Sequence, residues 1–157
     1  MLSVRSKKNR GNMRLKQIIS GVAVFTASAA LAHDGVQNPA VMARMHGMAE
    51  IAAQMKRLGD MVKGTVPFDA TVAREASAGI ADHAAQVPGL FRAEETDPKS
   101  EALPAIWDDF ADFSARSDQL AEIASGFSTA ITQPADLGPA LAALGATCRS
   151  CHQIYRK

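Results

Sequence analysis

Five consecutive residues near the C-terminus, Cys148-Arg149-Ser150-Cys151-His152, have types and spacing that could do chemistry together. Positions i, i+3 and i+4 lie on one face of an α-helix, so both thiols and the imidazole can point at one flat ligand. Cys-x-x-Cys-His is the attachment signature of a c-type haem, in which the thiols add across two vinyl groups and His152 lies below the iron as proximal ligand. The motif predicts one covalently bound haem c.

Two other uses of these residues stay open. A structural zinc site needs further Cys or His ligands at suitable spacing, and the remaining histidines, His33, His46 and His83, are scattered. A thioredoxin-like dithiol needs a preceding strand in a βαβ setting, which the sequence does not show. A disulfide between Cys148 and Cys151 would close only a tiny loop and stabilise little. Haem attachment is therefore the preferred interpretation.

Four stretches of helical periodicity must position this motif, and they predict an all-α protein. Asn38 and Pro39 suit an N-cap and a first helical residue, and Gly64 suits the end of that helix. Asp69 is expected to cap the second helix, which should end before Pro88. The predicted helices span about 39–63, 70–87, 100–131 and 137–155, with a loop over 90–98. Such amphipathic helices favour an antiparallel four-helix bundle with the haem attached near the C-terminus.

Residues 1–32 have the layout of a secretory signal peptide. Six basic and no acidic residues lie in this stretch, and an uncharged segment with an apolar centre closes on Ala30-Leu31-Ala32. Cleavage is expected before His33. A transmembrane anchor is the alternative, but the apolar segment is short for a span of about 20 residues. We therefore expect a periplasmic protein without stable membrane insertion after cleavage.

Removal of the signal changes the charge of the protein. The whole chain has a formal net charge of +1, whereas residues 33–157 hold 11 basic and 16 acidic side chains, a net charge of about −5. An acidic surface repels phosphates, so nucleic acid is excluded as a partner. We expect a flexible lead over 33–37 and a single domain over 38–157.

The chain resembles the class II c-type cytochromes, which comprise cytochrome c′ and the cytochrome c-556 group. Cys148 and Cys151 match the thioether positions of this family, and His152 matches its proximal ligand. The resemblance covers 38–157 and includes these further pieces: Arg44-x-x-x-Met48, Val62-Lys63-Gly64 followed by Pro67-Phe68-Asp69, Ile106-Trp107, and the segment from Cys148 to Arg156.

The resemblance also implies roles for three other residues. Arg156 matches a basic residue beside the proximal haem face, and Arg44 matches an arginine near the haem propionates, where a cation offsets carboxylate charge. Met48 matches the position that faces the distal side of the iron. Ligation by its sulfur would give six-coordinate, low-spin iron suited to electron transfer. Packing alone would leave five-coordinate iron in an apolar pocket, which in cytochrome c′ binds NO or CO.

These observations predict a monohaem electron carrier that is not an enzyme. Its expected partners are redox proteins, with a diatomic gas (NO or CO) as the alternative ligand if Met48 only packs. The resemblance further suggests a homodimer through the first two helices. Small residues would permit close contact there, at Ala49, Ala52, Ala53, Ala73 and Ala76.

Overall fold

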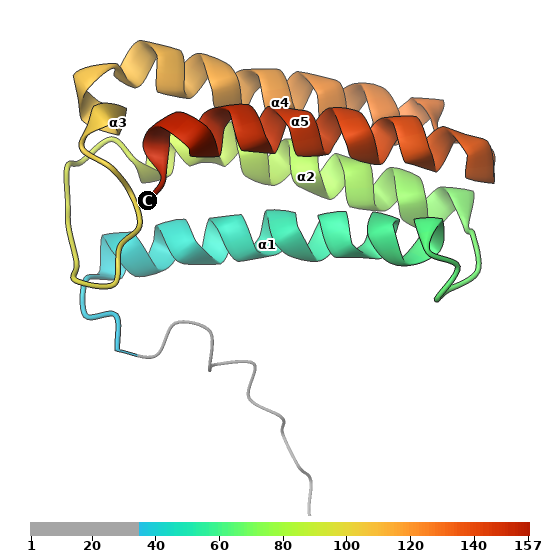
Figure 1. The fold of residues 1–157 in the computed structure, drawn as a ribbon, viewed down its shortest axis with the longest axis horizontal. Coiled ribbons are helices and arrows are strands. Elements are labelled where there is room, and N and C mark those ends of the chain that lie inside the picture. The colour runs from blue at the N-terminus through green and yellow to red at the C-terminus, as the bar shows by residue number, and fades with distance from the viewer. Residues whose placement is uncertain (1–34) are drawn as a thin grey trace, which may run out of the picture.

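The computed structural model describes residues 35–157, which form an antiparallel four-helix bundle (Figure 1). The predicted signal peptide lies outside the described residues. The long helices are α1 (Pro39–Val62), α2 (Ala70–Leu90), α4 (Phe110–Ala130) and α5 (Leu137–Tyr155), and a short helix α3 (Ala105–Asp108) and a 3-10 turn η2 (Pro134–Asp136) precede the last two. The predicted all-α bundle is confirmed.

The helix boundaries predicted at Asn38, Gly64 and Asp69 are present. The Asn38 side chain accepts hydrogen bonds from the amides of Ala40 and Val41 at 2.8 and 3.1 Å, which satisfies donors that no helical carbonyl can reach. Asp69 caps α2 in the same way. Gly64 has a φ of 69°, a left-handed conformation that favours glycine, directly after α1 ends.

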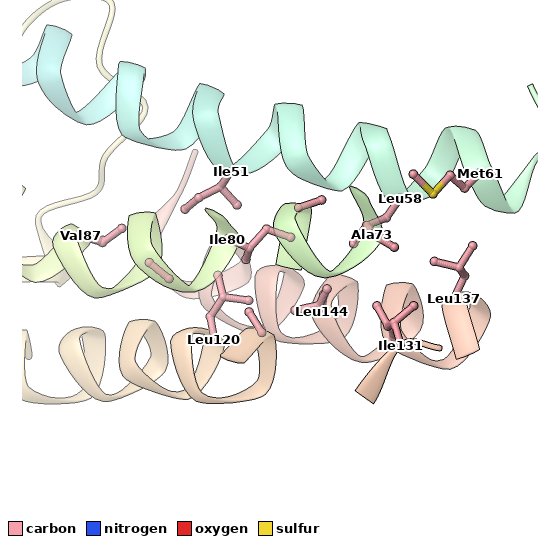
Figure 2. Packing of buried hydrophobic residues seen from close by; sticks show 14 of the residues in the cluster. Ile51, Leu58, Met61, Ala73, Ile80, Val87, Leu120, Ile131, Leu137 and Leu144 are labelled. Atoms are coloured by element: carbon pink, nitrogen blue, oxygen red, sulfur yellow. The ribbon is translucent and has the colours of Figure 1, made fainter. Parts of the chain in front are cut away.

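The hydrophobic core runs along the bundle because each helix contributes one apolar stripe. α2 packs against both α1 and α4, and its Ile80 is fully buried, as are Leu58 of α1 and Leu144 of α5 (Figure 2). α1 and α5 touch each other less extensively. The start of α1 and the end of α5 lie at the same end of the bundle (Figure 1).

α2 does not end before Pro88, as the sequence analysis predicts, but continues through it to Leu90. Proline has no N–H and cannot donate to the carbonyl four residues earlier, here that of Ala84. The hydroxyl of Ser117 on α4 donates a 2.7 Å hydrogen bond to this carbonyl instead. A side chain from the neighbouring helix thus replaces the missing donor and lets the last turn form.

The third predicted helix is also interrupted. Asp109 has φ −136° and ψ 65°, which separates α3 from α4, and its side chain accepts a 3.1 Å hydrogen bond from the amide of Asp112. Asp109 therefore acts as an N-cap in the middle of a continuous apolar pattern. The expectation of a single helix from about residue 100 was wrong. The apolar pattern does not show that the Asp109 side chain takes the place of a helical backbone carbonyl as the hydrogen-bond acceptor.

Hydrogen bonds hold the loop between α2 and α3 at two points along its length. Asp97 accepts hydrogen bonds of 2.8 and 3.0 Å from the amides of Gln37 and Asn38, which fixes the start of α1. Further along, the amide of Leu103 donates to the carbonyl of Tyr155 at 3.0 Å. The loop therefore ties the start of α1 to the end of α5.

One further expectation needs correction. Ala73 and Ala76, expected on a dimer surface, are buried inside the bundle and offer nothing to a second chain. Within residues 35–157, none of the helices combines the length and apolar character that crossing a bilayer requires.

Candidate functional site

A cavity of about 350 Å³, partly open to solvent, is lined mainly by α1, α4, α5 and the loop that precedes α3, with Val87 of α2 and Ile106 of α3. Its walls are mainly apolar, with Val41, Ile51, Phe113 and Leu120 among the lining residues. The cavity brings together every site residue predicted from the sequence: Arg44, Met48, Cys148, Cys151, His152 and Arg156. Residues more than 100 positions apart in the chain therefore meet at one site.

The Cys-x-x-Cys-His motif lies on the last turns of α5, so its reactive side chains share the face that lines the cavity. Cys148 and Cys151 are free thiols and both are half-buried. Burial raises the pKa of each thiol, because a thiolate loses hydration there. Desolvation, aided by the charge of Arg156, lowers the pKa of His152.

Two methionines of α1 face the motif across the cavity. Met48 and Met45 are three residues apart, hence on one face of the helix, and both are half-buried lining residues. Thioethers are soft, weakly basic groups that either fill apolar space or bind iron. The cavity thus places an imidazole and thioethers on different walls.

Arg44 is almost fully buried in the cavity wall, where its guanidinium donates to three backbone carbonyls. The bonds go to Leu90, Ala93 and Glu95, at 3.1, 2.6 and 2.7 Å, and the guanidinium also lies 4.8 Å from the Phe91 ring centre. Desolvation lowers the pKa of this arginine. Arg44 therefore fastens the loop with three of its five donors, and a contact with haem propionates stays a prediction.

Arg156 forms a two-pronged ion pair with Glu101 at the rim of the cavity. Its Nε and Nη2 atoms lie 2.6 and 2.5 Å from one Glu101 carboxylate oxygen. Both side chains are about half exposed, so the pair contributes little to stability. Its effect is local, because the two charges shift the pKa of His152 in opposite directions, with Arg156 lowering it and Glu101 raising it.

A hydrogen-bonded trio beside the cavity was missed by sequence reasoning. Tyr155 donates a 2.7 Å hydrogen bond to Asp112, and Asp112 also accepts a 2.6 Å hydrogen bond from Nε of Arg116. Arg116 and Tyr155 both line the cavity, and Arg116 also reaches the carbonyl of Ser150 at 3.4 Å. The spacing of Asp112 and Arg116, four residues apart on one helix, was the available signal.

The donor set fits a covalently attached haem. Two free thiols and an imidazole line one wall of a mainly apolar cavity, thioethers line another, and Arg44 and Arg156 supply cationic side chains to its lining. Residues 35–157 contain no cluster of three or more His, Cys, Asp or Glu that could hold a metal ion, so a zinc site has no support in this part of the chain. The shared cavity wall therefore suits the attachment of a flat haem.

Comparisons with known proteins agree with this geometry. The family model described as cytochrome C′ matches residues 39–156. The chain is 36% identical to cytochrome c-554 of Cereibacter sphaeroides, covering 85% of this chain and 91% of that protein, and 35% identical to cytochrome c-556 of Agrobacterium tumefaciens, covering 73% and 91%. The structure of cytochrome c′ from Rhodopseudomonas palustris is similar, with a TM-score of 0.71 at 30% identity, covering 77% of this chain and 98% of that one.

Proposed function

Because the chain belongs to the cytochrome c′ family, whose members bind one covalently attached haem c, we propose that Cys148 and Cys151 form its two thioether bonds and that His152 is an axial ligand of the iron. The observation that carries this proposal is that all three side chains line the same apolar cavity. A haem held there supplies iron that alternates between the ferric and ferrous states and so carries one electron.

The protein residues around the cavity have supporting roles in this proposal. Apolar side chains such as Ile51, Phe113 and Leu120 exclude water, and a drier site favours the iron state of lower charge. Arg44 fixes the loop that closes the cavity. The Tyr155–Asp112–Arg116 trio holds the end of α5 against α4.

We further infer that Met48 supplies the second axial ligand. The support is its place on the cavity wall contributed by α1, while His152 lies on the wall contributed by α5. Thioether ligation raises the reduction potential and leaves no open position for a gas. The function is then electron transfer between protein partners rather than binding of NO or CO.

An absorption spectrum of the purified holoprotein tests this assignment. Sharp α and β bands after reduction, together with a weak red methionine-to-iron band in the oxidised protein, are the expected result. Broad high-spin bands and rapid CO binding after reduction would instead identify a five-coordinate, gas-binding site.

The periplasm is the proposed location. The basic and apolar layout of residues 1–32 supports export. An export assay with this segment fused to a reporter enzyme tests the location, and retention of the reporter in the cytoplasm would contradict it.

A further inference from the structure

Acidic side chains outnumber basic ones on the α2–α4 side of the bundle. α2 and α4 together carry five acidic and two basic residues, whereas α5 carries no Asp or Glu at all. The chain has a net negative charge after the predicted cleavage, so a surface without net negative charge differs from the rest of the protein.

A groove between α1 and α5 lies next to the cavity, on the surface that these two helices form. Ala52 lines both the cavity and the groove, so the two are adjacent. The charged residues that line the groove are all cations, namely Lys56, Lys63 and Arg149, and each is exposed. Asp60 lies beside the groove and pairs with Lys56 at 2.5 Å, which leaves Lys63 and Arg149 as the uncompensated charges.

The floor of the groove permits close approach by another molecule. Gly59, Gly138 and Gly145 line it together with Ala52, so the helix backbones come close to the surface at these positions, between larger side chains such as Met55 and Leu141. A Cβ atom at Gly145 would lie 3.3 Å from Nη1 of Arg149, which shows that this guanidinium lies over the glycine. Arg149 also belongs to the Cys-x-x-Cys-His motif, so the basic surface begins at the attachment site itself.

We propose that this α1–α5 face is the docking surface for an acidic redox protein. The inference rests on the proposed electron-transfer function and names the charge of the partner. Acidic side chains on the partner complement the cations, while the acidic α2–α4 side repels it and so orients the encounter. The low floor then brings the redox centre of the partner close to the site at which Cys148 and Cys151 attach the haem.

A redox-inert paramagnetic anion locates the surface without relying on electron transfer. Hexacyanochromate(III) added to the reduced holoprotein should selectively broaden the NMR amide signals of Lys56, Gly59, Gly145 and Arg149. Signals of Asp82 on α2 and Glu122 on α4 should stay sharp. Uniform broadening, or broadening confined to another face, would overturn the proposal.

Charge reversal supplies the matched control. The double variant K56E/K63E should lose the selective broadening, whereas R57E/R92E, which changes the net charge equally away from the groove, should retain it. An oligoglutamate peptide should displace the anion from the wild-type protein. Failure of the peptide to compete would show a site for small anions only and reject an acidic polypeptide as the occupant.

Kinetics separates this proposal from the function on which it rests. Oxidation by hexacyanoferrate(III) should slow several-fold between about 10 and 200 mM salt if the basic face governs the encounter, because salt screens attraction. A rate that increases with salt would show that the net negative charge dominates, and the docking face would be wrong. Absence of any electron transfer would reject the proposed function, while the NMR result would still stand.

Discussion

The hydroxyl of Tyr155 donates a 2.7 Å hydrogen bond to the carboxylate of Asp112, joining the last residue of α5 to the first turn of α4. Tyr155 is buried, lines the cavity and lies three residues after His152. Its ring also meets Phe113 edge to face, with centres 5.3 Å apart. The orientation of the haem-binding end of α5 therefore depends on this contact.

Alkaline unfolding should report the Tyr155–Asp112 bond. Burial, and then the hydrogen bond to Asp112, raise the pKa of Tyr155 from 10.0 to about 12 in the folded protein. A raised pKa stabilises the fold below pH 10, and this contribution is lost as the pH increases through about 12. Tyr155→Phe should lower Tm by roughly 3–8 °C at pH 7 and flatten the loss of stability above pH 10. If thermal unfolding at increasing pH showed the same decrease in Tm above pH 10 for Tyr155→Phe as for the wild type, this role of Tyr155 would be contradicted.

Ser117→Ala should destabilise the protein by about 1–3 kcal/mol, because the carbonyl of Ala84 would lose the donor that Pro88 cannot provide. Urea unfolding measures the change. In a Pro88→Ala background, which restores a backbone N–H, the same substitution should cost much less, and a double-mutant cycle quantifies this coupling. Ser77→Ala is the matched control, since that buried hydroxyl donates to Ala73 in the interior of the same helix and replaces no missing donor.

Arg44→Met should lower the free energy of unfolding by about 2–4 kcal/mol, because three loop carbonyls lose a charged donor at once. Hydrogen exchange should accelerate across the loop while the middle of α2 stays protected. Arg57→Met, an exposed substitution on the same helix, is the control and should change neither quantity. Equal protection of the loop in both variants would refute the fastening role of Arg44.

Met48→Leu and Met45→Leu separate ligation from packing. Both residues line the cavity from α1, so the two substitutions remove similar thioethers from similar surroundings. We expect Met48→Leu alone to abolish the red band of the oxidised protein, to lower the reduction potential and to open the iron to CO. The same result from Met45→Leu, or no effect from either, would reject Met48 as the ligand.

Local signals in the sequence were sufficient to predict the bundle and to place the candidate haem-binding residues together on one cavity wall. Asn38, Asp69 and Gly64 act on backbone groups a few residues away in the sequence. The i, i+3, i+4 spacing places Cys148, Cys151 and His152 on one helix face whatever the fold. Such features depend on residues a few positions apart, which a sequence displays directly.

The missed features depend on partners that only the tertiary structure brings together. α2 continues past Pro88 because Ser117 lies opposite it, 29 residues later in the chain. Arg44 binds carbonyls about 50 residues away, so its spacing from Met48 suggests a cofactor contact but does not reveal the loop that it fastens. Likewise, Asp112 and Arg116 form a recognisable helix pair, but nothing local indicates that Tyr155 joins them.

The mass of the purified protein tests the central claim most directly. Chain matured in a host that assembles c-type cytochromes should gain the mass of one haem, which acidified organic solvent cannot remove, and the gain should disappear in Cys148→Ser/Cys151→Ser. A mature wild-type chain from the same host that carries no added mass and has both thiols free would contradict the account.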